Sequence, residues 1–287
     1  MTTDYRPRRS ALYLPASNER AIAKARTLPA DIVILDLEDA VAPDAKAEAR
    51  KAAVAAVQEG GFAAGEVAIR ANGLDTEWGA QDLKAIALSG ADAVLVPKVS
   101  SAADIARYHD AIAAAPPAMQ LWAMIETCAS MAQLDAIAAM SASTRLSLWV
   151  MGTNDLAKEM RARLTPERTP FLPLLSMAVA AARAHDVAII DGVCNEFRDL
   201  DVFRAEAEQG LLFGFDGKSL IHPAQIEPCN AVFSPSEAEL EWARAVIAAF
   251  ALPENKGKGA ISVAGQMAEL LHLDQAKRLV AMVTERD

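Results

Sequence analysis

The chain has 287 residues, and its 38 acidic and 28 basic side chains give a formal net charge of −10. Hydrophobic residues make up 53% of it, but no apolar run approaches the roughly 18 residues that cross a bilayer, and the acidic charge argues against nucleic acid as a partner. Three widely spaced cysteines without a CxxC pair, and the lack of a signal-type stretch, indicate a reduced, cytoplasmic protein without a zinc site.

Short aliphatic runs alternate with alanine-rich segments, which is the pattern of βαβ units. The expected strands are Ser10–Leu14, Ile32–Asp36, Glu66–Arg70, Ala93–Val96, Leu121–Ile125, Leu146–Val150, Ala188–Ile190 and Leu211–Phe213. The expected helices are Glu19–Thr27, Pro43–Gln58, Glu77–Ala87, Ala102–Ala115, Ser130–Ala139, Phe171–Ala184 and Arg198–Gln209. Continuous apolar runs such as DIVILDL are typical of strands buried on both faces. Eight strands with polar residues at their ends predict an α/β fold, a (β/α)8 TIM barrel over residues 1–233.

The remaining residues, 234–287, have a different pattern and are expected to form a helical extension. Ser236–Phe250 is predicted to be a helix, with Ser236 as its cap and Glu239 three residues later. A polar linker, Leu252–Gly259, is followed by an amphipathic helix expected from about Met267 to Met282. We interpret this extension as a lid.

Ionisable or polar side chains follow nearly every expected strand, where barrel enzymes place their chemistry. They are Asp36, Glu38 and Asp39 after the second strand, Arg70 at the end of the third, Lys98 after the fourth, Glu126 after the fifth, Gly152–Asp155 after the sixth and Asp191 after the seventh. Each one alone has a structural alternative: Asp36 or Asp191 could be a helix N-cap, and Arg70 could form a buried ion pair with Glu126. Six on one rim indicate a functional site, because buried charges must be paired or bound to a metal.

Carboxylates without a cluster of His or Cys residues point to magnesium, which prefers one or two carboxylates together with waters and substrate oxygens. Glu126 and Asp155 are the predicted direct ligands. Glu38 and Asp39 are predicted to act in catalysis by holding the waters of the metal. Arg70 offers a planar cation that suits a developing enolate or carboxylate oxygen.

Several segments, in this order, resemble the citrate lyase β-subunit-like branch of the HpcH/HpaI aldolase superfamily, close to malyl-CoA and citramalyl-CoA lyases. They are RSALYLPASN (Arg9–Asn18), DLEDAV (Asp36–Val41), IRANG (Ile69–Gly73), VPKV (Val96–Val99), IET (Ile125–Thr127), GTNDLAKEM (Gly152–Met160) and GKSLIHPAQI (Gly217–Ile226). Each segment alone is a weak signal, but their number and order make the resemblance specific.

The resemblance implies a magnesium-dependent lyase that cleaves or forms the carbon–carbon bond of a small 3-hydroxyacyl-CoA such as malyl-, citramalyl- or citryl-CoA, with an α-keto acid as the second fragment. It implies magnesium on Glu126 and Asp155, and Arg70 in contact with substrate and enolate. It also implies a carboxylate-binding pocket at Gly152, Thr153 and Asn154. The expected assembly is a homotrimer or hexamer in which the C-terminal segment reaches the site of a neighbouring subunit.

The lid segment departs from the family pattern. Many relatives carry Gly-x-Met-x-Asp, whose aspartate removes a proton from the acyl methyl group, whereas this chain has Gly265–Glu269 with a glutamate at the end. An extra methylene displaces the catalytic carboxylate, and such a misplacement can cost on the order of 10²-fold in rate. Glu269 is still the predicted lid base, but the change keeps a malyl-CoA-type thioesterase on the same barrel as an open alternative. Two further alternatives are a CoA-independent pyruvate-class aldolase and a non-catalytic protein that binds CoA esters.

For CoA, the segment Ser17–Arg20 begins a predicted helix, and a helix N-terminus beside cations can hold phosphates. Asn18, Arg20 and Lys24 are the candidates, although each could equally be a solvated surface residue. His222, which precedes Pro223, is interpreted as shaping a turn and not as a base.

Overall fold

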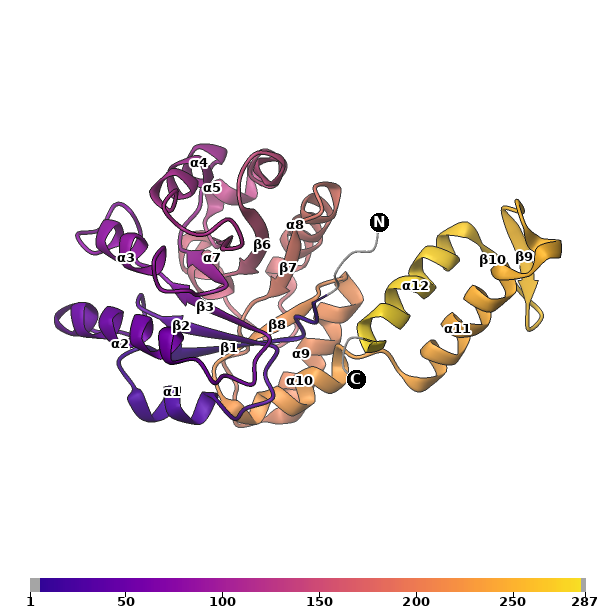
Figure 1. Cartoon of the computed structure of the whole chain (residues 1–287), viewed down its shortest axis with the longest axis horizontal. Helices are drawn as coiled ribbons and strands as arrows, with labels where there is room; N and C mark the ends of the chain where they lie inside the picture. Colours follow the sequence, from indigo (N-terminus) through magenta and orange to yellow (C-terminus); the bar gives the residue numbers. More distant parts are fainter. Residues whose placement is uncertain (1–5, 285–287) are drawn as a thin grey trace. The chain divides into compact units, whose positions relative to one another are not determined.

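The computed structural model describes residues 6–284 (Figure 1). Contacts divide these residues into two compact units. One unit spans Arg8–Phe233, and the other comprises the residues from Ser234 on together with Arg6 and Pro7. Among the described residues, no helix combines the length and apolar character that crossing a bilayer requires.

The larger unit is a closed barrel of eight parallel strands, each hydrogen-bonded to its neighbours in chain order (Figure 1). The strands are β1 (Ser10–Pro15), β2 (Ile32–Asp36), β3 (Glu66–Arg70), β4 (Ala93–Val96), β5 (Gln120–Ile125), β6 (Leu146–Met151), β7 (Ala188–Asp191) and β8 (Gly217–Leu220). The helices around them are α1 (Glu19–Ala25), α2 (Lys46–Glu59), α3 (Gly79–Ile86), α4 (Ala102–Ala111), α5 (Cys128–Met131), α6 (Leu134–Ala138), α7 (Thr153–Met160), α8 (Leu172–Ala184), α9 (Leu200–Phe213) and α10 (Ile226–Val232). The predicted (β/α)8 barrel is therefore confirmed.

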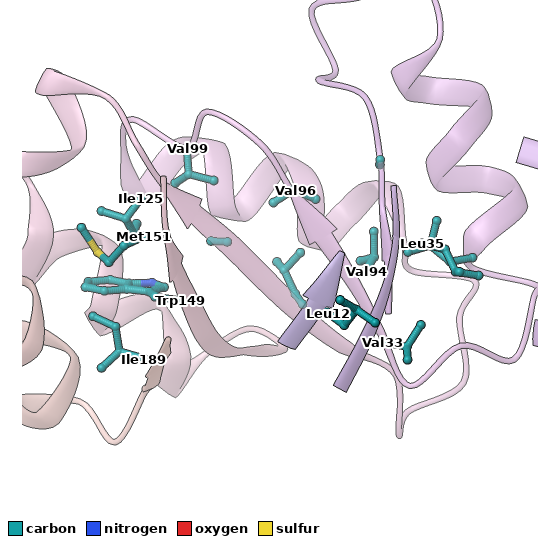
Figure 2. Packing of buried hydrophobic residues seen from close by; sticks show 14 of the residues in the cluster. Leu12, Val33, Leu35, Val94, Val96, Val99, Ile125, Trp149, Met151 and Ile189 are labelled. Carbon is teal, nitrogen blue, oxygen red and sulfur yellow. The ribbon is translucent and has the colours of Figure 1, made fainter. Parts of the chain in front are cut away.

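Strand side chains alternate between two apolar layers, as the pleat requires. One layer fills the inside of the barrel and includes Ile34, Leu95 and Trp122. The other lies between strands and helices, where residues such as Leu35 and Trp149 pack (Figure 2). Because both faces of every strand are covered, polar side chains that point inward collect at the open ends of the barrel.

The eighth strand differs from the prediction. The segment Leu211–Phe213, expected to be a strand, forms the last turn of α9, which ends at Gly214 with a left-handed φ of 90°. An apolar run suggested burial, yet Leu212 is 85% exposed. The true strand, β8, contains Lys218, a residue type that suggests a surface loop until its buried ion pairs are seen.

Two smaller differences concern helices. The helix expected over Ser130–Ala139 begins earlier, at Cys128 after the capping box of Thr127, and is divided at Ala132 and Gln133 into α5 and α6. The helix α7, immediately after β6, was not predicted.

The C-terminal unit consists of α11 (Glu237–Ala251), a hairpin of β9 (Ala260–Val263) and β10 (Gln266–Glu269), and α12 (Leu270–Thr284). The predicted cap of α11 is confirmed: the Glu239 N–H donates to Ser236 Oγ and the Ser236 N–H to Glu239 Oε2, at 3.3 and 2.7 Å. The expected start of the final helix at Met267 is wrong, since residues 260–269 pair as antiparallel strands. Ala264 and Gly265, both at positive φ, form the tight turn between the two strands. The strands are too short for their alternation of polar and apolar residues to have predicted a hairpin.

Candidate active site at the barrel rim

A cavity of about 300 Å³ opens at the carboxyl ends of the strands. Its lining comes from β1, β2, β3, β5, β6, β7, β8 and the loops that follow them, and consists of Tyr13, Asp36, Asp39, Ala40, Arg70, Met124, Glu126, Met151, Gly152, Thr153, Asn154, Asp155, Val193, Ser219 and Ile221. Eight of the residues singled out in the sequence line it: Asp36, Asp39, Arg70, Glu126, Gly152, Thr153, Asn154 and Asp155. The barrel thus brings these residues into one space, although Asp36 and Asp155 are 119 positions apart in the chain.

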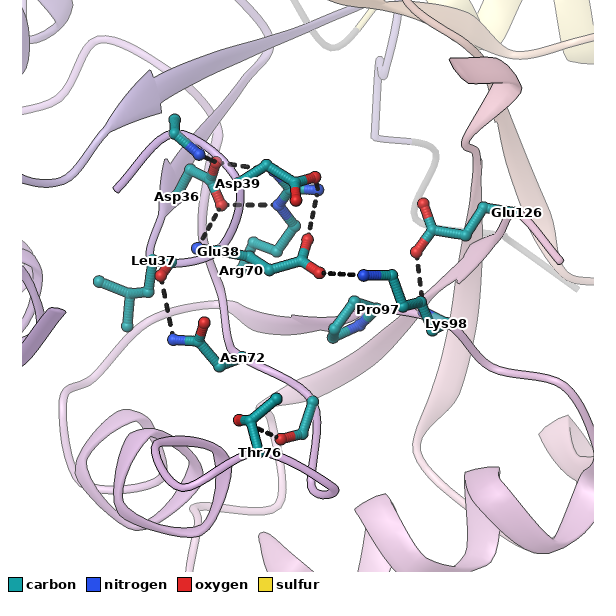
Figure 3. Close-up of polar contacts among 12 residues, drawn as sticks. Asp36, Leu37, Glu38, Asp39, Arg70, Asn72, Thr76, Pro97, Lys98 and Glu126 are labelled. Atoms are coloured by element: carbon teal, nitrogen blue, oxygen red, sulfur yellow. Dashed lines mark hydrogen bonds and ion pairs between the residues drawn. The ribbon is translucent and has the colours of Figure 1, made fainter. Parts of the chain in front are cut away.

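Arg70 is the most tightly held cation of the cavity (Figure 3). The register of β2 and β3 places it beside Asp36, and its Nε and Nη2 atoms lie 2.6 and 2.7 Å from the two oxygens of that carboxylate. Its Nη1 atom lies 2.8 Å from Glu38 Oε2, as an ion pair without hydrogen-bond geometry, and 3.3 Å from Asp39 Oδ2. Burial opposes its charge, but Asp36, Tyr13 and Glu38 together outweigh burial, and the pKa of Arg70 is raised. Arg70 is therefore a fixed, permanently charged group.

Lys98 connects two of the carboxylates (Figure 3). Its Nζ lies 3.2 Å from Glu38 Oε1, and its backbone N–H donates to Glu126 Oε1 at 2.8 Å. The residue has a left-handed φ of 54°, which is uncommon for a side chain of this size. Burial raises the pKa of Glu38, and repulsion from Asp39 adds to this, against the opposing attraction of Arg70 and Lys98.

Glu126 lies at the end of β5 with only 1% of its surface exposed. Burial, followed by repulsion from Glu38, raises the pKa of Glu126 to about 8. A Cβ atom on Gly152 would collide with Glu126 Oε2, so glycine at this position leaves room for the second carboxylate oxygen. The carboxylate is thus oriented by Lys98 on one oxygen and kept unobstructed on the other.

The donor set fits a hard cation. Asp155, in the first turn of α7, lines the same cavity as Glu126 and is only partly exposed. Across residues 6–284, no three or more His, Cys, Asp or Glu side chains converge as a metal-binding group. Two carboxylates alone match magnesium, which completes its coordination with waters and substrate oxygens, and do not match zinc.

The start of α7 forms another part of the wall. The N–H groups in the first turn of any α-helix have no partner within the helix. In α7 the N-cap is Gly152, so no side chain caps these N–H groups either. The side-chain amides of Asn154 and Asn195 exchange two hydrogen bonds. The Thr153 side chain packs against Gly192, where a Cβ atom would collide with it. Unpaired N–H groups at a helix start favour an anion, such as a carboxylate, in front of them.

Asp191 has a different role from the other strand-end carboxylates. It is fully buried, and Arg168 Nη1 lies 2.7 Å from both of its oxygens. Lys218 Nζ lies 2.9 Å from Asp191 Oδ2 and 2.7 Å from Glu206 Oε1. Asp191 is absent from the cavity lining and belongs to a buried network that joins β7 and β8. Asp191 is thus structural, but through ion pairs and not as the helix N-cap considered for it, since the next helix, α9, is capped by Asp199.

The remaining candidates are not among the residues that line the cavity. Asn18 Oδ1 accepts the Ala21 N–H at 3.0 Å and so caps α1, while Arg20 and Lys24 are exposed. Glu269 ends β10 in the C-terminal unit, where its N–H donates to His272 Nδ1 at 2.9 Å. The predicted turn role of His222 agrees with its Nδ1 atom accepting the Ala224 N–H.

Sequence reasoning missed Tyr13 and Met124, which line the cavity from inside the barrel. It singled out Asp36 but did not predict that Asp36 orients Arg70. The available signal was the strand alternation, since Tyr13 and Met124 have the parity of the inward-facing Ala11 and Trp122.

A closed parallel barrel with a rim cavity of carboxylates around a fixed arginine defines a protein of the TIM-barrel enzyme class. The family model described as HpcH/HpaI aldolase/citrate lyase matches residues 9–223. The chain belongs to this family, as its sequence motifs indicated.

Relatives with curated names cover nearly the whole chain. A (3S)-malyl-CoA thioesterase of Cereibacter sphaeroides (strain KD131) is 50% identical over 275 residues, which are 96% of this chain and 94% of the relative. The citrate lyase subunit beta of Escherichia coli (strain K12) is 33% identical over 283 residues, with 96% and 93% covered. The crystal structure of CitE from Mycobacterium tuberculosis in complex with magnesium, acetoacetate and coenzyme A has a TM-score of 0.75 and 28% identity, and covers 96% of this chain and 97% of that one.

Proposed function

We propose that this protein hydrolyses the thioester of a malyl-CoA-type substrate. The observation that carries the proposal is the 50% identity, over 96% of the chain, to a relative named (3S)-malyl-CoA thioesterase, in a protein whose rim cavity combines Arg70 with Glu126 and Asp155. The thioesterase was the alternative reading of the sequence, kept open by Glu269. The carbon–carbon lyase expected first is the second candidate, favoured by the 33% identity to a citrate lyase subunit beta.

We propose that Glu126 and Asp155 hold a magnesium ion. The orientation of Glu126 by the Lys98 N–H and the space left by Gly152 support this role. When bound, the ion supplies Lewis-acid polarisation of substrate oxygens. Glu38 and Asp39, which both pair with Arg70, would hold water molecules in place.

The protein's own groups would bind the acyl part at both ends. The N–H groups of Thr153 and Asn154 at the start of α7 would receive the terminal carboxylate. Arg70, fixed by Asp36, would stabilise the negative charge that develops on the thioester oxygen during attack by water. Because Asp36 holds the guanidinium before substrate arrives, little reorganisation is needed at the moment of reaction.

A carboxylate must also accept the proton of the attacking water. We propose Glu269, supplied by the C-terminal unit of a neighbouring subunit in a trimer or hexamer, for this role. The exposed apolar side chains next to it support a docking role for the hairpin, since Met267, Leu270 and Leu271 are 69%, 52% and 52% exposed. Asp39, which is exposed and lines the cavity, is the other carboxylate in a position to direct water.

We propose that CoA binds along α1, with Asn18, Arg20 and Lys24 near its phosphates. A groove of about 480 Å³ supports this position. It is lined by Ser17 and Glu19 at the start of α1 and by Ala45, Glu48, Ala49, Lys51, Ala52 and Ala55. The small alanine side chains leave space beside the start of α1, and Lys51 is the cation of this lining.

The test is a product analysis by mass spectrometry. The protein is incubated with malyl-CoA, with and without magnesium, and with excess chelator. Hydrolysis consumes one water and gives malate and free CoA, whereas cleavage gives acetyl-CoA and glyoxylate without consuming water. We expect malate and free CoA, dependent on magnesium. Acetyl-CoA and glyoxylate as the sole products would replace the proposal with the lyase, and full activity in excess chelator would contradict the metal assignment. Acetyl-CoA alone is the control for secondary hydrolysis.

A further inference from the structure

The floor of the cavity carries a phenol whose chemistry the proposed function does not yet use. Tyr13 points into the barrel from β1, and its O–H donates to Met124 Sδ on β5 at 3.3 Å. In the closed order β1 to β8, these two strands lie on opposite sides of the barrel. The Tyr13 ring therefore spans the lumen, and its oxygen lies on the floor.

The position of Met124 shows what lies above this oxygen. A Cβ atom on Gly152 would come within 3.1 Å of Met124 Cε, so the methionine side chain reaches beneath the start of α7. Tyr13, Met124, Glu126 and Gly152 all line the same cavity. The phenol oxygen is consequently close to the place where the proposed metal ligands and helix N–H groups would hold the acyl group.

The Tyr13 hydroxyl is a donor with a weak acceptor. A thioether sulfur accepts hydrogen bonds poorly, whereas buried tyrosine hydroxyls usually find a stronger partner. Burial raises the pKa of Tyr13 well above its usual range, so the hydroxyl stays protonated. The Arg70 guanidinium carbon lies 5.1 Å from the ring centroid and holds the ring in place as a cation–π pair. The group can exchange its sulfur partner for a substrate oxygen at little cost.

We propose that Tyr13 is a specificity-determining residue that donates a hydrogen bond to the hydroxyl oxygen of the bound acyl group. The inference rests on the proposed function, because it assumes a hydroxyacyl substrate in this cavity. When the acyl group lacks that oxygen, the Tyr13 hydroxyl keeps only the Met124 thioether as its acceptor. Such an acyl group therefore binds more weakly by the free energy of one hydrogen bond. A hydrogen bond of about 1 kcal/mol corresponds to roughly a fivefold difference in affinity.

The test is Tyr13→Phe, which removes only the hydroxyl and keeps the ring under Arg70. Malate and succinate differ by the hydroxyl, and their affinities for the full-length protein with magnesium and CoA are measured by calorimetry, without turnover. The wild type is expected to bind malate more tightly. Tyr13→Phe is expected to weaken malate binding roughly fivefold and to change succinate binding less than twofold.

Tyr108→Phe is the matched control. The Tyr108 hydroxyl contacts the Leu74 N–H and the Pro97 carbonyl and lies outside the cavity lining, so its removal should leave the ratio of the two affinities unchanged. The inference is overturned if Tyr13→Phe weakens both acids equally, if it changes neither, or if the wild type binds malate no more tightly than succinate. A wild type that prefers malate through Tyr13 but hydrolyses no malyl-CoA would instead refute the proposed function alone.

Discussion

At the scale of single residues, several carboxylates lie close together in and beside the cavity because cations and N–H groups pair with them. Asp36 occupies two nitrogens of the Arg70 guanidinium, and Glu38 and Asp39 approach the third. Lys98 adds the second cation beside Glu38. Each carboxylate is thus oriented by a cation or an N–H group, which is the condition for burying several of them near one another.

Arg70→Lys tests whether the guanidinium stabilises charge that exists only in the transition state. A lysine keeps the charge but cannot reproduce the two-pronged contact with Asp36. We expect kcat for malyl-CoA hydrolysis to fall on the order of 10²-fold, with a smaller change in KM. Steady-state kinetics measure both. If only KM rises, Arg70 binds the ground state and the oxyanion role is wrong.

At the scale of elements, the junction between β6 and α7 adjoins the proposed metal ligand Glu126. Gly152→Ala places a methyl group against the Glu126 carboxylate. We expect magnesium affinity, measured by calorimetry, to fall by about 10- to 100-fold, the range seen when the support of a metal ligand is disturbed. Gly65→Ala is the control, because a Cβ atom there meets only the Asp31 carbonyl at an ordinary 3.7 Å. Unchanged magnesium binding in Gly152→Ala would show that Glu126 is not a ligand.

The network between β7 and β8 predicts a pH-dependent contribution to stability. Burial opposes the charge of Asp191, but Lys218 and Arg168 hold the pKa of this carboxyl below its ordinary value of 3.8. A carboxyl with a lowered folded-state pKa contributes its full stability above the unfolded value and loses it as the pH falls through the folded value. The contribution is therefore complete at pH 7 and declines only below about pH 4.

Asp191→Asn removes this charge at nearly constant volume and leaves Lys218 and Arg168 without their shared partner. We expect the free energy of unfolding in urea to fall by about 3–5 kcal/mol at pH 7, and the difference from wild type to shrink below about pH 4. Asp201→Asn is the control, because it breaks an exposed ion pair with Arg204. It should change the free energy of unfolding by less than about 0.5 kcal/mol. If Asp191→Asn lowers the free energy of unfolding equally at pH 7 and below about pH 4, the asparagine disturbs packing and not the ion pairs.

At the scale of the whole molecule, the two units have separate hydrophobic cores. The C-terminal core includes Ala243 and Val246 of α11, Ile261 and Ala268 of the hairpin and Ala276 of α12. None of these residues belongs to the cores of the barrel. A unit with its own core can present Glu269 without contributing to the stability of the barrel.

Variants of Glu269 test the proposed contribution of this unit to catalysis. We expect Glu269→Ala to lower malyl-CoA hydrolysis by about 10²- to 10⁴-fold, as loss of a general base does, with magnesium affinity unchanged. Glu269→Asp should raise the condensation of acetyl-CoA with glyoxylate, because it restores the shorter carboxylate of lyase-type relatives. Product analysis follows both reactions. If Glu269→Ala retains every CoA-ester activity, the base lies elsewhere, and Asp39→Asn becomes the variant to examine.

The sequence by itself determined the barrel, because seven correctly placed apolar runs with helical segments between them leave few other ways to cover both faces of each strand. β2, β3 and β4 have the predicted bounds. It also indicated most of the cavity, since parallel strands bring the residues that follow them to one rim, as with Glu126 and Asp155. The local pattern was sufficient for the cap of α11, because a capping box involves neighbours in sequence.

Only the tertiary structure decided which charges pair and which remain available. Asp191 and Asp36 both end a strand, yet Asp191 points outward to Lys218 and Arg168, while Asp36 faces the cavity beside Arg70. Lys218 makes β8 a buried strand, although its charge suggests a surface, because partners from other elements neutralise it. Tyr13 becomes part of the floor only when β1 and β5 face each other across the barrel. These outcomes depend on contacts between residues far apart in the chain, and local propensity does not contain them.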